Sequence, residues 1–326
     1  MNTRKIPVTV ITGFLGAGKT TLVNHLLAAR SERIGVIVNE FGEVGIDGEL
    51  IVNDDKPLIE IRNGCVCCTV RTDLVAGVKA LLAESALLPE RLIVETSGLA
   101  DPAPVLQTFL ADGDLLQRVE LEAVITLVDA ANFHRQIGDD IAKEQIAFAD
   151  LIVVNKAGLL EDEQLACLQH ALRAMNPVAA IVPTDHARIS ADDVPGLQRF
   201  SLAQLLSVEP GILTDEHDHE HDDSIVSCAL QSEAPLDPER FSRWINQLVQ
   251  QQGQTIMRTK GVLHFQGEAR QFTFHSVHML TEAKPGKRWP QDSPRTSRFV
   301  VIGRDLDIAS LKHGFASCVA AQAVCV

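Results

Sequence analysis

The chain has 326 residues, enough for about two domains, and 46% of them are apolar, as is ordinary for a globular protein. Its formal net charge of −14 argues against nucleic-acid binding, which needs a basic face. No apolar run approaches the roughly 18 residues of a membrane span, and the basic residues 1–5 lead into a strand without a cleavage site. We therefore expect no membrane anchor and no signal peptide. The seven cysteines are odd in number and clustered, which indicates a reducing cytoplasm rather than a disulfide framework.

A strand, a glycine-rich loop and a helix are predicted at the start of the chain. The β-branched run 6–11 precedes G-x-x-x-x-G-K-T at residues 13–20, and residues 21–27 have helical spacing. This is the context of a phosphate-binding loop. Three glycines would let backbone N–H groups converge on phosphate oxygens: Gly13, Gly16 and Gly18. Lys19 would reach the β- and γ-phosphates without packing against the fold, and the Thr20 hydroxyl would ligate Mg²⁺. The sequence thus predicts binding of a nucleoside triphosphate.

An acidic segment with three glycines, residues 39–48, follows the second predicted strand. It is placed to move near the γ-phosphate. Asp47 and Glu43 are therefore candidates for orienting water or contacting Mg²⁺. Solvated loop acids with no role in the site are the alternative, since loops carry such acids routinely.

Three thiols within four residues follow the Asn63-Gly64 turn: Cys65, Cys67 and Cys68. A bent chain could bring them onto one thiophilic ion, and thiolates select Zn²⁺ or Cu⁺ over hard cations. The spacing is not the C-x-x-C of zinc knuckles, so it does not fix the type of site. Buried apolar cysteines, a vicinal disulfide and a redox pair are the alternatives, of which a reducing compartment weakens the last two.

A buried strand at residues 92–95 ends in Glu95, and Gly98 lies three residues further on. In phosphate-loop enzymes such an acid holds the Mg²⁺ hydration shell, and such a glycine contacts the γ-phosphate. An ordinary strand-end glutamate beside a turn is the alternative. The candidate catalytic residues are thus Lys19, Glu95 and Asp47.

A base-recognition motif is expected after the strand 151–154. Asn155 would bond the base edge and the stem of Lys156 would pack on its face, as in an N-K-x-D motif, but position 158 is Gly158. The missing aspartate would accept from the guanine N1–H and 2-amino group, so its loss reduces the expected preference for GTP over ATP. We expect Gly158→Asp to sharpen that preference, and backbone groups near residues 184–186 are the next candidates for contacting the base.

The first two-thirds of the chain alternates short apolar strands with helices. This pattern predicts an α/β fold, a mostly parallel sheet covered by helices on both faces, with ligands at the carboxyl ends of the strands. The predicted strands are 8–12, 35–38, 58–61, 92–95, 124–128, 151–154 and 180–182. The predicted helices include 74–82, 105–110, 141–149 and 163–175.

An acidic, histidine-rich stretch then separates this part from a small α+β domain. We place the phosphate-loop domain at residues 1–205, the linker at 206–223 and the C-terminal domain at 224–326. The linker histidines point the same way in an extended chain and form a loose acceptor for Zn²⁺, Ni²⁺ or Co²⁺: His217, His219 and His221. A merely solvated linker is the alternative.

The C-terminal domain is expected to contain strands near 224–230, 254–265, 271–277 and 299–302, a helix starting at Asp237-Pro238 and a last helix from Ile308. Residues 284–298 are expected to form a basic, solvated loop around Trp289, with contact to a partner or a phosphate as the alternative. The scattered cysteines are expected to be packing residues: Cys167, Cys228, Cys318 and Cys325.

These motifs together resemble the CobW-type GTPases, metal-homeostasis proteins of the SIMIBI class of phosphate-loop NTPases. The resemblance rests on G-F-L-G-A-G-K-T-T, N-E-F-G-E, N-G-C-V-C-C, E-T-S-G-L-A-D-P, the histidine-rich linker and R-x-K-G at 258–261, and spans nearly the whole chain. It implies that residues 13–21, including Ala17 and Thr21, bind nucleotide and Mg²⁺. It also implies that the three clustered cysteines form an internal metal motif. Gly158 departs from the family's aspartate.

The leading hypothesis is a GTP-hydrolysing metallochaperone or metal insertase that handles zinc or cobalt and delivers it to a client metalloprotein. The candidate metal-contacting residues are Cys65, Cys67, Cys68, Thr20, Glu43, His217, His219 and His221. Two rivals remain: an ATP-dependent NTPase or kinase with structural cysteines, and a non-enzymatic zinc buffer or sensor. The sequence leaves open a monomer or a homodimer.

Overall fold

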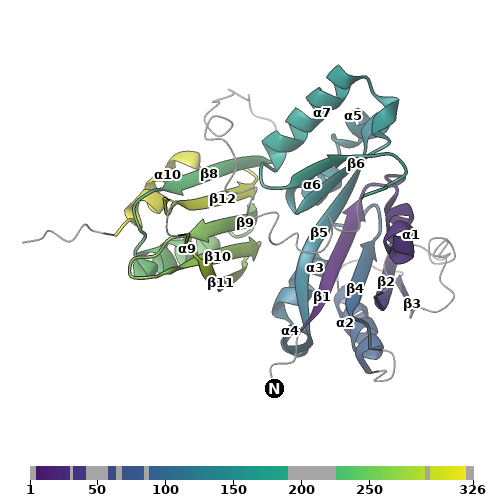
Figure 1. Ribbon diagram of the computed structural model, residues 1–326, viewed down its shortest axis with the longest axis horizontal. Coiled ribbons are helices and arrows are strands. Elements are labelled where there is room, and N and C mark those ends of the chain that lie inside the picture. Colours follow the sequence, from purple (N-terminus) through teal and green to yellow (C-terminus); the bar gives the residue numbers. More distant parts are fainter. Residues whose placement is uncertain are drawn as a thin grey trace, which may run out of the picture. The chain divides into compact units, whose positions relative to one another are not determined.

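The computed structural model describes residues 5–29, 32–41, 58–63, 68–83, 88–189, 225–290 and 294–320 (Figure 1). For residues 39–41, 58–63 and 68–73 it describes the backbone alone. Two compact units emerge, one from residues 1–172 with 179–200, the other from 173–178 with 201–326. The predicted linker and its limits lie outside the described residues.

In the first unit, the described strands form one seven-stranded sheet in the order β3-β2-β4-β1-β5-β6-β7, and all neighbours are parallel. The strands are β1 (Ile6–Gly13), β2 (Ile34–Phe41), β3 (Leu58–Asn63), β4 (Arg91–Thr96), β5 (Val119–Asp129), β6 (Leu151–Asn155) and β7 (Ala180–Pro183). Every residue of β4 and β6 is buried, as expected for strands covered on both faces.

Helices connect these parallel strands: α1 (Lys19–Ala29), α2 (Cys68–Ala83), α3 (Ala103–Ala111), α4 (Gly113–Arg118), α5 (Phe133–Gln136), α6 (Asp140–Ala147) and α7 (Asp162–Met175). Short polar side chains fix two of the helix starts. The Asp112 carboxylate accepts from the backbone of Asp114 and Leu115 at α4, and Asp139 accepts from Ile141 at α6. Such caps satisfy amides that have no partner within the helix. The predicted helix-flanked parallel sheet is confirmed.

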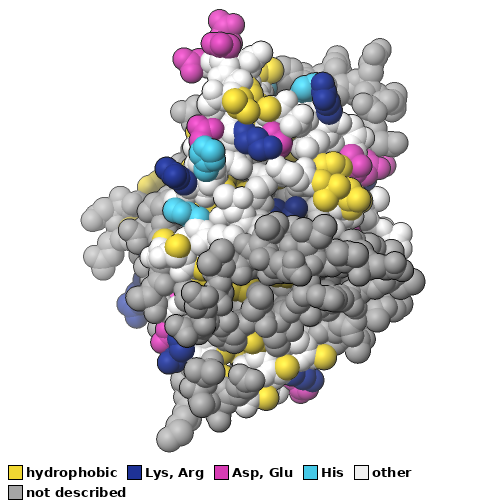
Figure 2. Space-filling view, turned by 90° about the vertical axis from the view of Figure 1, so that its right-hand side faces the viewer, with side chains coloured by type: hydrophobic (Ala, Val, Ile, Leu, Met, Phe, Trp, Pro, Cys, Tyr) yellow, Lys and Arg dark blue, Asp and Glu magenta, His cyan; other side chains and the backbone are white. Residues whose placement is uncertain are grey.

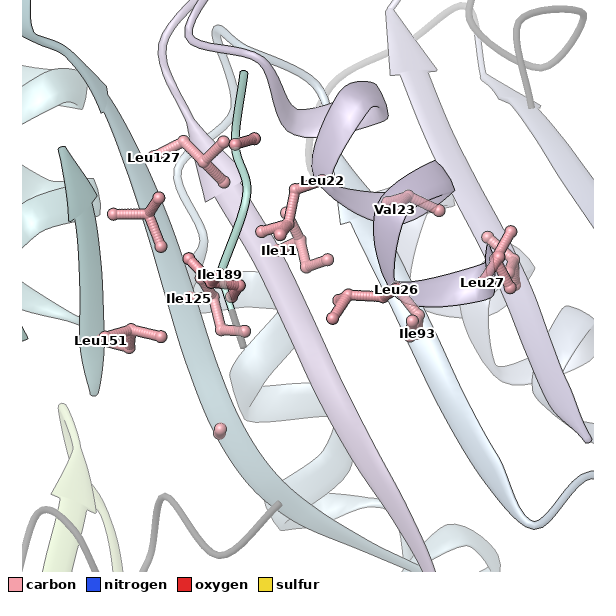
Figure 3. Packing of buried hydrophobic residues seen from close by; sticks show 14 of the residues in the cluster. Ile11, Leu22, Val23, Leu26, Leu27, Ile93, Ile125, Leu127, Leu151 and Ile189 are labelled. Carbon is pink, nitrogen blue, oxygen red and sulfur yellow. The ribbon is translucent and has the colours of Figure 1, made fainter. Parts of the chain in front are cut away.

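The core beneath the phosphate loop is built around α1 (Figure 3). The helix buries Leu22, Val23, Leu26 and Leu27. They pack in a cluster with residues of six strands and of the segment after β7, among them Ile11, Ile93, Ile125, Leu127, Leu151 and Ile189. Because close-packed interiors resist displacement, this cluster holds the start of α1 at the end of β1, where the phosphate loop lies.

The second unit has an antiparallel sheet in the order β11-β10-β9-β12-β8 and two helices, counting only described residues. Its elements are β8 (Val226–Ser232), α9 (Pro238–Gln252), β9 (Ile256–Leu263), β10 (Arg270–Val277), β11 (Leu280–Arg288), β12 (Ser297–Gly303) and α10 (Ile308–Ser317). The Asp237 carboxylate caps α9 by accepting from Glu239 and Arg240, both at 2.9 Å. The core contains edge-to-face aromatic pairs, such as Phe241 with Phe299. The α+β expectation is confirmed.

Two local predictions were wrong. Residues 284–288 belong to β11, which pairs with β10, and Trp289 is buried instead of solvated. Pro285 obscured this strand, but β11 lies at the sheet edge, where a residue without an N–H is tolerated. Cys167 is exposed, because the buried positions of α7 are Leu168 and Leu172, one turn apart.

The described surface carries charges of both signs. On the face drawn in Figure 2, Lys and Arg side chains lie among Asp and Glu side chains. In the parts of the chain that the structure describes, no helix has both the length and the apolar character needed to cross a membrane. Large apolar side chains that are exposed lie mostly apart in the chain: Leu15, Leu88, Leu99, Leu159, Met279 and Ile308.

Candidate functional site

The phosphate loop joins the end of β1 to the start of α1. Gly13 and Gly18 have φ angles of 137° and 104°, which side-chain-bearing residues rarely adopt. A Cβ atom at Gly13 would lie 2.3 Å from the Leu127 carbonyl oxygen, and one at Gly18 would lie 2.5 Å from Asn155 Nδ2. The glycines are therefore required by the packing of this loop as well as by its turn. The arrangement directs the N-terminus of α1 at the loop, a site suited to an anion.

Lys19 is the first residue of α1. Its side chain is buried, and its Nζ donates to the Phe14 carbonyl oxygen at 3.3 Å. The Lys19 ammonium thus contacts the phosphate loop, where phosphate oxygens would bind. The expectation that Lys19 has no packing role was wrong, because the side chain is only 8% exposed.

Thr20 and Glu95 meet although they are 75 residues apart. The Thr20 hydroxyl donates to Glu95 Oε1 at 2.8 Å, and Glu95 is 2% exposed at the end of β4. The parallel pairing of β1 with β4 brings the two together. A hydroxyl and a carboxylate are the hard oxygen donors that Mg²⁺ prefers. The chemistry of this pair therefore fits Mg²⁺.

The turn after β4 lies against the phosphate loop. A Cβ at Gly98 would come within 2.8 Å of the Leu15 amide nitrogen. The Gln145 amide, buried on α6, donates to the carbonyls of Gly98 and Ala100 at 3.3 and 3.2 Å. Gln145 could not be identified from the sequence, since its partners are 45 or more residues away. Its contacts fix the glycine expected beside the γ-phosphate.

Asn155 connects two loops at the end of β6. Its Nδ2 donates to the Ala17 carbonyl at 2.8 Å, and its Oδ1 accepts from the Ala187 amide at 2.8 Å. The side chain is 3% exposed. These contacts tie the phosphate loop to the loop after β7. A contact between Asn155 and a nucleotide base stays a prediction.

Lys156 adopts a left-handed φ of 62°, and its Nζ lies 2.6 Å from Asp129 Oδ2. Asp129 ends β5 and is almost fully buried. Burial acts to raise the pKa of Asp129, but hydrogen bonds from Lys156 and Asn132 outweigh it and lower that pKa below its ordinary value. The lysine stem is thus held at the edge of the site by a buried, ionised carboxylate that sequence analysis did not identify.

Several predicted metal and switch residues lie outside the described residues, or have no described side chain: Glu43, Asp47, Cys65, Cys67, Cys68, His217, His219 and His221. The backbone nevertheless places the strands that lead to them. Phe41, at the end of β2, pairs in register with Asn63, at the end of β3, and Asn39 pairs with Thr96 of β4. Both segments therefore leave the sheet at the edge that carries Glu95. Among described residues there is no cluster of three metal-ligating side chains.

Comparison with known proteins agrees with this geometry. Residues 7–183 match the model of the CobW/HypB/UreG nucleotide-binding domain, and residues 225–319 match the cobalamin synthesis protein cobW C-terminal domain. The zinc chaperone YjiA of Escherichia coli is 32% identical, over 95% of this chain and 98% of its own length. The zinc chaperone CobW of a Sinorhizobium species is 29% identical, over 95% and 96%. The crystal structure of Zn(II)-bound YjiA GTPase superposes with a TM-score of 0.73 and 27% identity, covering 98% of this chain and 100% of that one. The chain therefore belongs to the CobW/HypB/UreG family of nucleotide-binding proteins and carries the CobW C-terminal domain.

Proposed function

We propose that the chain binds and hydrolyses GTP and uses this cycle to hold zinc and release it to a client metalloprotein. Support comes from relatives named zinc chaperones and from the similarity to a GTPase whose crystal structure contains Zn(II). It also comes from a complete set of phosphate-site features: the glycines, Lys19, Thr20 and Glu95. A reducing compartment such as the cytoplasm would keep the clustered thiols available for metal.

The observation that carries the proposal is the strand register at the sheet edge. Thr20 and Glu95 are in contact, and Asn39 and Phe41 of β2 are in register with Thr96 of β4 and Asn63 of β3. Loops that start from adjacent strand ends share one edge of a parallel sheet. The acidic loop and the cysteine segment thus begin beside the expected γ-phosphate position. Gain or loss of the γ-phosphate would therefore act on the segment that carries the three cysteines.

In hydrolysis, a water oxygen would attack the γ-phosphorus while the bond to the β,γ-bridging oxygen breaks. Lys19 and the loop amides would stabilise the charge on the phosphate oxygens, and the amide of Gly98, which lies against the phosphate loop, would contact the γ-phosphate. Mg²⁺, when bound, would neutralise charge on the β- and γ-phosphates, with Thr20 and Glu95 as the residues that hold it. Asp47 is our candidate for orienting the water.

The cargo would bind as thiolate complexes at Cys65, Cys67 and Cys68. Three thiolates in one short segment favour Zn²⁺ over hard cations, and Co²⁺ or Ni²⁺ remain possible cargoes. The linker histidines would add weaker sites, because fixing a chain segment around an ion costs conformational entropy.

Single-turnover hydrolysis and zinc titration test the proposal together. The wild type should hydrolyse GTP, slowly if a partner normally stimulates it, and bind about one Zn²⁺ tightly. Lys19→Ala should lose nucleotide binding. Replacing Cys65, Cys67 and Cys68 by serine should remove the tight zinc site and leave GTP binding intact, whereas Cys167→Ser, at an exposed cysteine on α7, is the matched control and should change neither.

Two results would contradict the proposal. If ATP is hydrolysed in preference to GTP, the rival reading of an ATP-dependent enzyme gains support. If zinc binds tightly but no nucleotide is hydrolysed even in a single turnover, the chain is a zinc buffer or sensor that uses nucleotide as a structural ligand.

A further inference from the structure

The segment after β6 lacks the carboxylate that a guanine site needs. Asn155, Lys156 and Ala157 are followed by Gly158, which is exposed in the middle of η3 (Ala157–Leu159). Guanine presents two adjacent donors, the N1–H and the 2-amino group, and an ionised carboxylate can accept from both. Without such an acceptor, position 158 contributes nothing that would select guanine over adenine.

Another carboxylate stands at this position. Asp185, in the loop after β7, accepts from the Gly158 amide through Oδ1 at 3.1 Å. A Cβ atom built on Gly158 would lie 2.7 Å from Asp185 Oδ2 and 3.4 Å from its Oδ1 and Cγ atoms. The Asp185 carboxylate thus fills the direction in which a side chain at position 158 would project. Any residue other than glycine at 158 would have to displace it.

The loop that carries Asp185 is anchored on both sides. The Thr184 amide donates to the Val154 carbonyl at 2.8 Å, and the Thr184 carbonyl accepts from the Ala157 amide at 3.0 Å. The Thr184 hydroxyl donates to the Arg188 carbonyl at 2.6 Å. Beyond Asp185, the Ala187 amide is held by Asn155, the residue that also contacts the phosphate loop. The position of Asp185 is therefore fixed relative to the phosphate site.

The carboxylate is available to a ligand. Asp185 is exposed, and within the described residues its Oδ2 accepts no hydrogen bond, while Oδ1 accepts only from Gly158. Lys156, which precedes Gly158 by two residues, is held by Asp129 at the same strand ends. A purine placed along the Lys156 stem would meet the Asp185 carboxylate at its edge.

We propose that Asp185 is the guanine-recognising residue of this chain and replaces, from the next loop, the aspartate that is absent at position 158. This rests on the proposed GTP function. The carboxylate would accept from the guanine N1–H and 2-amino group. Adenine lacks the 2-amino group and presents an unprotonated N1, so the same carboxylate would repel it.

The test compares GTP, ITP and ATP affinities of the full chain. Hypoxanthine in ITP keeps the N1–H and lacks the 2-amino group, so the GTP-to-ITP ratio reports that contact alone. Asp185→Asn keeps an oxygen for the Gly158 amide. It should weaken GTP binding about 10- to 100-fold, which is the effect of losing a hydrogen bond to a charged acceptor. ATP affinity should not fall, and the preference for GTP over ITP should disappear. Asp162→Ala, at an exposed aspartate in the first turn of α7, is the control and should change no ratio.

A swap gives the sharpest outcome. Contrary to the expectation from the sequence, Gly158→Asp alone should not improve guanine selectivity, because the two carboxylates would compete for one place. Combined with Asp185→Ala, it should restore the selectivity that Asp185→Ala removes. If the wild type prefers GTP and both Asp185 variants keep the wild-type ratios, this inference fails and the proposed function stands. If the wild type shows no preference for GTP over ATP, both fail.

Discussion

Replacing Asn155 by alanine tests whether this one buried amide joins the phosphate loop to the loop that carries Asp185. Asn155 is 3% exposed and uses both ends of its amide, on the Ala17 carbonyl and the Ala187 amide, each at 2.8 Å. The variant leaves two buried backbone groups without partners. Each unpaired buried group costs about 1–3 kcal/mol, so the variant should lose at most about 2–6 kcal/mol of its free energy of unfolding. Water entering the vacated space should reduce the loss to about 3 kcal/mol.

Urea unfolding followed by two signals distinguishes a loss of stability in the first unit from a loss in the whole chain. Both tryptophans of the chain, Trp244 and Trp289, lie in the C-terminal unit, so fluorescence follows that unit and circular dichroism follows both. Asn155→Ala should move the dichroism transition to lower urea and weaken nucleotide binding at least about tenfold, since two ligand-facing loops loosen. Asn246→Ala, exposed on α9, is the control. A dichroism transition within about 0.5 kcal/mol of the wild type, with unchanged nucleotide affinity, would refute the connecting role of Asn155.

Two further predictions concern backbone strain and acid stability. Gly18→Ala should destabilise the first unit by about 2 kcal/mol and weaken nucleotide binding, because its φ is 104° and its Cβ would lie 2.5 Å from Asn155 Nδ2. Gly113→Ala, where a Cβ meets nothing within 4 Å, should change urea unfolding little. Glu282 is held by a hydrogen bond from His275 and a second from Lys284, which lower its pKa from 4.5 to about 2. Its stabilisation is therefore present above about pH 4.5 and is lost as the pH falls towards 2. Glu282→Gln should cost the C-terminal unit about 1 kcal/mol at pH 7, since the pair is partly exposed, and nothing near pH 2. A deficit that persists unchanged at pH 2, followed by tryptophan fluorescence, would contradict this.

The parts of the fold that the sequence predicted are those with local signals. The phosphate loop has a fixed spacing, and the buried strands are short apolar runs between helices with regular periodicity. Such features depend on neighbours within about ten residues, so the chain itself displays them. Trp289 and the strand before it were missed because Pro285 argued against a strand, and only pairing with β10 shows that the position is an edge.

The candidate site shows more clearly what local sequence signals cannot predict. Gly158 by itself predicted a weakened preference for guanine, because a missing carboxylate is visible in the sequence. Its replacement, Asp185, is 27 residues away, and only the pairing of β6 with β7 brings the two loops together. Gln145 and Asp129 were overlooked for the same reason. Residues that act through long-range contacts carry no local signature.

The central claim is that nucleotide state controls zinc affinity, and the zinc dissociation constant measured in both nucleotide states tests it most directly. Purified protein would be titrated against a chromogenic zinc chelator, once with GDP and once with a non-hydrolysable GTP analogue, alongside the variant with serine at 65, 67 and 68. We predict that zinc affinity differs between the two states by at least about fivefold, that zinc shifts GTP affinity by the same factor, and that the triple-serine variant shows neither effect. Equal zinc affinity in both states, or a difference that survives loss of the three thiols, would contradict the account.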